Sequence, residues 1–164
     1  MQIATRRPRI TAEAITAEAF APFGQVFARP AEAGRLDPQL TLENGRPGAQ
    51  PMLTLIRVAP KQLPLEVTLL ERHPHSSQTF VPVHVDRYLV IVAPKRLDGR
   101  PDLAKVRAFI VAGDQGVNYR LDTWHHGLTV IDNEGEFAVW MWNDGSDADT
   151  EFLTLSEGFV VLTP

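Results

Sequence analysis

Residues 65–93 read LEVTLLERHPHSSQTFVPVHVDRYLVIVA and contain three short runs rich in β-branched and aromatic residues, separated by turn residues. Runs of this kind are typical of β-strands. Similar runs continue along the chain, with turns such as DGRPD and AGDQG between them. The nine runs are LTLIRV (53–58), LEVTLLERH (65–73), TFVPVHV (79–85), RYLVIVA (87–93), VRAFIVA (106–112), LTVI (128–131), EFAVWMW (136–142), EFLTL (151–155) and GFVVL (158–162). Together they predict an all-β fold, either a sandwich or a barrel.

The composition limits the kinds of protein this can be. The chain has 164 residues, no cysteine and a formal net charge of −4 at pH 7, and its lysines and arginines are mostly scattered. The lack of cysteine excludes a disulfide framework and thiolate chemistry, and it fits a reducing cytoplasm. The charge argues against a nucleic-acid partner, and no apolar run approaches the roughly 20 residues that cross a bilayer. We therefore expect a cytoplasmic protein that binds a small molecule.

The N-terminal third predicts a different organisation from the rest. Thr16 can cap a short helix through Phe20, with Thr11 as an alternative earlier start. Residues 29–51 carry four prolines and three glycines and little periodicity, which predicts a long irregular segment. The expected division of one domain over 1–164 is helix and irregular segment in 1–50 and β-barrel in 51–164.

The run from Leu65 to His75 changes from apolar to polar without changing face. Side chains alternate on a strand, so every second residue faces the same side. One face carries Leu65, Val67, Leu69, Glu71, His73 and His75. A buried carboxylate loses its hydration, so Glu71 needs a metal, an imidazolium or an arginine as its partner. This face predicts a polar site or a barrel mouth, unless Glu71 to His75 lies past the strand in solvent, with His-Pro-His as a turn.

A second histidine cluster lies in DTWHHGL, residues 122–128. Adjacent residues on a strand face opposite sides, so only one of His125 and His126 can be an interior ligand. Two strands that bring imidazoles into one barrel can build a site from histidine and carboxylate or amide oxygen. Such a donor set suits divalent nickel, zinc, manganese or iron. His84 is expected at a strand end on the surface, and Pro82 marks an edge strand or a bulge.

Three segments together resemble a known family. They are TAEAFAPFGQVF (16–27), LERHPHSSQTFVPV (70–83) and PDLAKVRAFIVAGDQGVNYRLDTWHH (101–126). The chain resembles the ureidoglycolate lyases, small proteins of the cupin superfamily. The resemblance implies a double-stranded β-helix (jelly-roll barrel) that is usually a homodimer. It also implies the splitting of (S)-ureidoglycolate into glyoxylate and urea late in allantoin degradation, with nickel as the generally assigned cofactor.

The resemblance further implies a metal site. In the general cupin pattern, the first motif carries His-x-His, four residues and Glu, and the second carries Gly-x-x-His. On this chain the first motif falls on Glu71, His73 and Gln78, and the second-motif histidine falls on His125. Glu71 and Gln78 differ from the usual His and Glu. These four residues are the expected metal ligands.

Catalytic and substrate-binding roles follow from the same alignment of motifs. The catalytic candidates are His126, His125 and His73. The substrate-binding candidates are Glu71, Arg72, Gln78 and Trp124. By strand alternation, Arg72 reaches the site only if the strand twists at its end, and Trp124 fits the core as well as a substrate contact. His75 fits a rim position as well as a ligand position.

Two departures from the family pattern leave other functions open. The region after the first Phe-Gly is shorter than in the family, and only Arg35, Asn44, Gly45 and Arg46 echo it. The segment 137–145 has tryptophans where relatives often carry an Asp-Arg pair, whose guanidinium could clamp a carboxylate. The alternatives are a cupin enzyme acting on another small α-hydroxy or α-keto acid, and a non-catalytic cupin that binds a small carboxylate.

Overall fold

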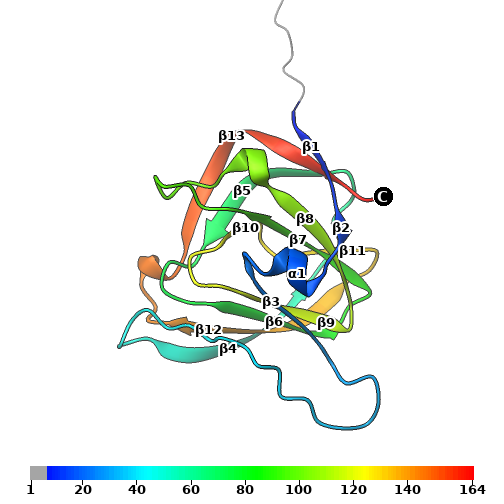
Figure 1. Ribbon diagram of the computed structural model, residues 1–164, viewed down its shortest axis with the longest axis vertical. Coiled ribbons are helices and arrows are strands. Elements are labelled where there is room, and N and C mark those ends of the chain that lie inside the picture. Colours follow the sequence, from blue (N-terminus) through cyan, green and yellow to red (C-terminus); the bar gives the residue numbers. More distant parts are fainter. Residues whose placement is uncertain (1–6) are drawn as a thin grey trace, which may run out of the picture.

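The computed structural model describes residues 7–164 and consists almost entirely of β-strands (Figure 1). The strands are β1 (Arg9–Thr11), β2 (Glu13–Ala14), β3 (Gly24–Ala28), β4 (Gln50–Val58), β5 (Leu65–Arg72), β6 (Gln78–His84), β7 (Arg87–Ala93), β8 (Arg107–Ala112), β9 (Gln115–Tyr119), β10 (Trp124–His125), β11 (Thr129–Ile131), β12 (Gly135–Asn143) and β13 (Glu151–Leu162). The helical elements are α1 (Ala17–Phe20) and the short 3-10 helices η1 (Leu103–Lys105) and η2 (Asp147–Asp149). The all-β prediction is confirmed. No helix in this range is long and apolar enough to cross a membrane.

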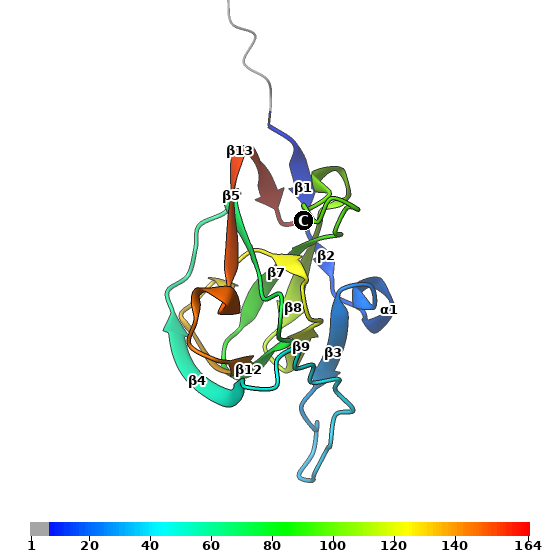
Figure 2. The ribbon, with the colours of Figure 1, turned by 90° about the vertical axis from the view of Figure 1, so that its left-hand side faces the viewer.

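Two sheets face each other and nearly close into a barrel of the cupin type (Figures 1 and 2). The larger sheet has the order β1-β13-β5-β10-β7-β8-β2 with β11 also paired to β7, and the smaller has the order β3-β9-β6-β12-β4. One apolar core lies between the sheets and a second lies on the other face of the larger sheet. On β7, Tyr88, Val90 and Val92 face the first core, and Leu89, Ile91 and Ala93 face the second. The uninterrupted apolar sequence of β7 follows from its burial on both faces.

The N-terminal part contains the predicted helix and three strands that were not predicted. The side chain of Thr16 accepts a hydrogen bond from Ala19 N, so the predicted cap of α1 is confirmed. The first two strands are only three and two residues long and pair in parallel with β13 and β8, whereas β3 pairs with β9. Besides the expected helix and irregular segment, residues 1–50 therefore also include these short strands. Strands this short carry too few residues for their alternation to be read.

The strict alternation expected on β5 is also wrong. Leu65, Val67 and Leu70 are buried in the same apolar cluster, while Leu69 is 42% exposed. The neighbouring strand β13 joins two predicted runs into one, and its pairing with β5 shifts between Thr154 and Phe159. This irregularity moves the buried side of β5 by one residue, because a bulge breaks the two-residue period.

Pro82 lies at a second irregularity. It is in β6, a central strand of the smaller sheet, and the pairing between β6 and β12 shifts next to it, between Glu136 and Phe137. The bulge alternative of the prediction is confirmed, because the missing amide of a proline is tolerated where a ladder is already interrupted.

The irregular segment between β3 and β4 leaves the barrel and returns to it (Figures 1 and 2). Most of its residues up to Leu42 are exposed. From Glu43 onward it lies against the turn that joins β5 to β6. Ser77 N donates to Glu43 O at 3.1 Å, and Gly45 N donates to His75 O at 2.8 Å.

Gly113 offers a test of the packing between the β8–β9 turn and the β6–β7 connection. A Cβ at this position would lie 1.9 Å from Val85 O and 3.0 Å from Asp86 O. We expect Gly113→Ala to lower the free energy of unfolding by roughly 1–3 kcal/mol, because the crowded atoms are backbone and cannot rotate away. Urea unfolding measures the change. Gly48→Ala is the control, since no described atom lies within 4 Å of its added methyl, and an equal loss in both variants would contradict this packing.

Candidate functional site

The candidate site lies where the two-residue strand β10 joins β5 to β7 (Figure 1). His125 pairs with Glu71 on one side and with Val92 on the other. Val92 belongs to the core between the sheets, so the side chain of His125 points into the barrel. His73 directly follows β5 and completes the group. The prediction that both histidine clusters face one interior site is confirmed for His73 and His125.

Three side chains converge closely enough to hold one metal ion. The ligand atoms of Glu71, His73 and His125 all lie within 4.8 Å of one another. His125 Nε2 is 3.3 Å from Glu71 Oε1, and the two imidazole rings are 5.3 Å apart between centroids. His73 is 5% exposed and His125 is 1% exposed. The alternative that residues 71–75 lie past the strand in solvent is therefore wrong for Glu71 and His73.

Backbone carbonyls fix the orientation of both rings. His73 Nδ1 donates to Asp149 O at 3.0 Å, and His125 Nδ1 donates to Thr123 O at 2.8 Å. A carbonyl only accepts, so the proton of each neutral ring is on Nδ1 and the lone pair is on Nε2. Both Nε2 atoms are buried without a hydrogen-bond partner among residues 7–164. This arrangement presents two ligand atoms to the same space.

Gln78 and two neighbours complete the walls of the site. Gln78 begins β6 and is buried, and its Oε1 likewise has no hydrogen-bond partner in the described chain. Its Nε2 contacts Met141 Sδ at 3.3 Å. Tyr119 stacks on the ring of His125 with centroids 4.3 Å apart. Tyr119 belongs to the core between the sheets, and this stacking also fixes the plane of a candidate ligand.

Burial and mutual charge set the protonation of the group. Burial, together with the nearby His125, lowers the pKa of His73 to about 4. Burial alone would raise the pKa of Glu71, but its close contact with His125 and the positive charge that the neighbouring histidines can carry outweigh burial, so that pKa is lowered. At neutral pH, Glu71 is therefore ionised and His73 is neutral, which are the states that bind a cation.

The whole chain can be compared with known proteins. The model of the family described as ureidoglycolate lyase matches residues 7–162. The chain belongs to the ureidoglycolate lyase family.

Relatives called ureidoglycolate lyase are similar along most of their length. One from Burkholderia cepacia is 39% identical over 142 residues, which cover 80% of this chain and 78% of that protein. One from Pseudomonas fluorescens strain Pf0-1 is 33% identical over 162 residues, covering 93% of this chain and 96% of the relative. One from Mesorhizobium japonicum is 33% identical over 165 residues, covering 95% and 99%.

Two predicted substrate contacts of this ureidoglycolate lyase family member lie outside the cluster. Arg72 pairs with Asp122 at 3.1 Å and with Glu151 at 2.7 Å, and its guanidinium lies 4.7 Å from the centre of the Trp124 ring. Trp124 is buried in the core on the other face of the larger sheet, and its Nε1 donates to Gly99 O at 2.9 Å. The structure thus gives both residues partners away from Glu71 and His125, and the core alternative for Trp124 is confirmed.

The remaining histidines occupy three different settings. His126 lies beside the site, where its Nδ1 donates to Leu69 O at 3.0 Å and burial lowers its pKa. His75 is half-buried in the turn after β5, outside the group of three converging ligands. His84 is exposed at the end of β6, as predicted. No sequence pattern signals the carbonyl of Asp149, because any residue supplies the same backbone acceptor.

The depressed pKa of His73 predicts acid sensitivity of the metal-free protein. Its pKa is 6.5 in the unfolded chain and about 4 in the folded one, so the unfolded chain binds more protons between these values. Stability should therefore fall as the pH falls from 6.5 to 4, by up to about 1.4 kcal/mol per pH unit from this group.

Urea unfolding of chelator-treated protein at several pH values measures this effect. The pKa of His126 is also lowered, so His126 likewise makes stability fall as the pH falls. The decisive comparison is therefore with His73→Gln, which should lose part of the pH dependence of stability. His84→Gln, at an exposed position, should keep all of it. An unchanged pH dependence in His73→Gln would show that His73 is not the titrating group.

Proposed function

We propose that this chain is a ureidoglycolate lyase that cleaves (S)-ureidoglycolate to glyoxylate and urea. The observation that carries the proposal is the convergence of Glu71, His73 and His125 in a chain that matches its family over residues 7–162. The site is small, polar and enclosed in an apolar barrel, which suits a small polar substrate held away from bulk water.

The residues of the site fit a divalent metal. Two imidazole Nε2 atoms and the Gln78 amide oxygen are buried and have no partner in the described chain, and an ionised carboxylate lies beside them. Nitrogen and oxygen donors of this kind suit nickel, zinc, manganese or iron, and we propose nickel. Glu71, His73, Gln78 and His125 would hold the ion. A bound metal would supply Lewis acidity toward the carboxylate and hydroxyl oxygens of the substrate.

The reaction needs one proton moved between two substrate atoms. The hydroxyl loses its proton as the carbon becomes the aldehyde of glyoxylate, the C–N bond breaks, and the leaving urea nitrogen gains a proton. We assign this transfer to His126, whose ring is neutral at pH 7 because burial lowers its pKa. Its Nδ1 contacts Leu69 O, and in this proposal its Nε2 accepts the hydroxyl proton and returns it to nitrogen.

The other side chains bind and orient. We assign Glu71 and Gln78 to contacts with the hydroxyl and the ureido group, while His125, stacked on Tyr119, presents its Nε2 in a fixed plane. The barrel buries His73, Gln78 and His125, while the Glu71 side chain stays 20% exposed. Arg72 and Trp124 are left out of the mechanism, since their contacts lie elsewhere.

Further parts of the proposal concern setting and assembly. We propose that the enzyme acts in the cytoplasm, in allantoin degradation, and as a homodimer. The outer face of β4 carries the exposed side chains of Leu53 and Leu55, and Leu53 pairs across to Trp140 on β12. This exposed apolar face is where we place the contact between two copies.

Chelation tests the reaction and the metal together. Purified protein given racemic ureidoglycolate should release glyoxylate, lose this activity after chelator treatment, and regain it when nickel or manganese is added. Activity that is indifferent to chelator would contradict the metal. Folded protein with no turnover in any state would contradict the substrate and favour another α-hydroxy or α-keto acid, or a binding role.

His125→Gln tests the convergence itself. Glutamine keeps a polar side chain of similar length but cannot place an imidazole Nε2 beside Glu71, so we expect kcat/KM to fall at least about 100-fold. His84→Gln, at an exposed strand end, should keep the parent activity. Circular dichroism and the thermal midpoint establish that both variants are folded. Parent-like turnover in folded His125→Gln would remove this residue from the site.

A further inference from the structure

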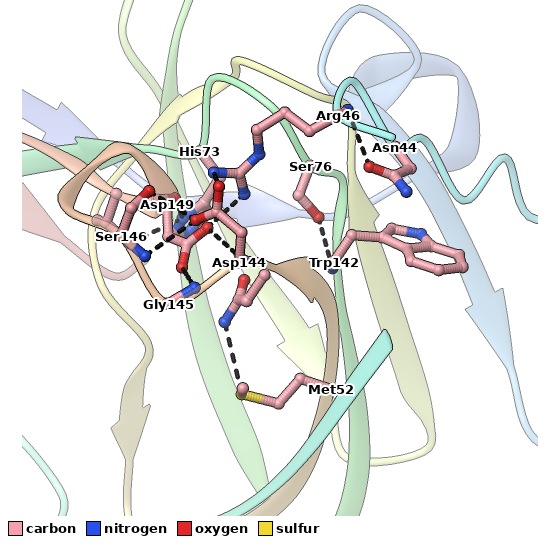
Figure 3. A network of polar contacts seen from close by, with 12 residues as sticks. Asn44, Arg46, Met52, His73, Ser76, Trp142, Asp144, Gly145, Ser146 and Asp149 are labelled. Atoms are coloured by element: carbon pink, nitrogen blue, oxygen red, sulfur yellow. Dashed lines mark hydrogen bonds and ion pairs between the residues drawn. The ribbon is translucent and has the colours of Figure 1, made fainter. Parts of the chain in front are cut away.

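A buried arginine connects the irregular segment after β3 to the loop between β12 and β13 (Figure 3). Arg46 Nη1 lies 2.9 Å from Asp144 Oδ2, and Arg46 Nη2 donates to Asp149 Oδ1. The side chains of Arg46 and Asp149 are 15% and 13% exposed, whereas the residues between Asp144 and Asp149 are exposed. The contact therefore joins the two ends of an otherwise exposed loop.

The same loop supports His73. The carboxylate of Asp149 also accepts the amides of Asp144, at 3.1 Å, and Gly145, at 2.8 Å. The backbone carbonyl of Asp149 accepts a hydrogen bond from His73 Nδ1 (Figure 3). Arg46 binds the side chain of Asp149, and the backbone carbonyl of Asp149 orients the ring of His73, a candidate metal ligand. A single residue, Asp149, therefore connects Arg46 to that ring.

The segment that carries Arg46 also braces the turn between the two candidate ligands His73 and Gln78. Glu43 N donates to Ser77 Oγ at 2.9 Å, and Gly45 N donates to His75 O at 2.8 Å. Asn44 forms an isolated β-bridge with Ser76, and its side-chain Oδ1 accepts a hydrogen bond from the backbone amide of Arg46 at 3.0 Å. Residues 43–46 thus hold the turn from one side while Arg46 reaches the β12–β13 loop on the other.

We propose that Arg46 is a positioning residue for His73. By joining Asp144 to Asp149 it keeps the Asp149 carbonyl on His73 Nδ1, and so keeps His73 Nε2 directed at Glu71 and His125. Buried partners that orient a ligating histidine affect metal affinity strongly, because a ring free to rotate or change tautomer presents its lone pair only part of the time. The proposal deepens the proposed function, on which the catalytic part of it rests.

The first test reads the ring directly in metal-free protein. Proton–nitrogen correlation spectra of the histidine rings show which nitrogen carries the proton. The parent should show His73 as one tautomer, protonated on Nδ1, and Arg46→Gln should show a mixture. Asp149→Asn should have the same effect, and the double variant should be no worse than either single one, since both remove the same contact.

The matched control is Arg57→Gln. Arg57 also lies between two carboxylates, Glu134 and Glu136, but it is exposed on β4 in the smaller sheet, and neither carboxylate belongs to the loop that contacts His73. Its loss should leave the His73 signals unchanged. If Arg46→Gln does not fold, Arg46→Lys, which keeps the charge but cannot bridge two carboxylates through a planar fork, takes its place.

Metal titration and kinetics give the second reading. Nickel binding to folded Arg46→Gln should be roughly 10–100-fold weaker than to the parent, and kcat at saturating nickel should recover more than affinity does. Parent-like ring signals and parent-like nickel affinity in the folded variant would overturn the proposal. A parent without turnover would instead overturn the proposed function, while the ring spectra still decide the role of Arg46.

Discussion

The pairing of His125 with Glu71 is the contact on which the rest of the structure depends. Within residues 7–164, the two-residue strand β10 is what connects β5 to β7 in the larger sheet, and both of its ladders pass through His125. The same residue is the deepest candidate ligand. The barrel is therefore closed by the residues that form its candidate site, where the ionised Glu71 and two imidazole lone pairs form a donor group that a bound cation would neutralise.

The buried polar atoms of the site fall into two groups, those with a hydrogen-bond partner in the described chain and those without one. Backbone carbonyls satisfy the Nδ1 atoms of His73 and His125, whereas their Nε2 atoms and the Gln78 oxygen find no partner in the described chain. Unpaired buried acceptors are costly, so a group of them around one point is expected where a ligand supplies the missing interactions. Arg46 extends this support outward, so that the site depends on a segment distant in sequence.

Much of this could be predicted from the sequence, for identifiable reasons. The long strands could be predicted, because the alternation of apolar residues along a strand depends only on local burial. The cap at Thr16 could be predicted, because the hydrogen bond that it makes lies within one helical turn. The one-residue shift that buries Leu70 could not, because its cause is an irregularity in β13. The support of His73 by Asp149 could not, because a carbonyl has no side-chain signature. Arg72 was placed by motif spacing alone, and the partners it finds depend on the tertiary structure.

The two-residue length of β10 has an evolutionary consequence. In most enzymes a lineage can lose its catalytic residues and keep its scaffold, since chemistry and folding use different positions. Here a substitution at position 125 changes a candidate ligand and, at once, a residue of the strand that links β5 to β7 in the larger sheet. Selection for a stable barrel and selection for the site act on the same two residues, which restricts the routes by which this fold could acquire a different chemistry.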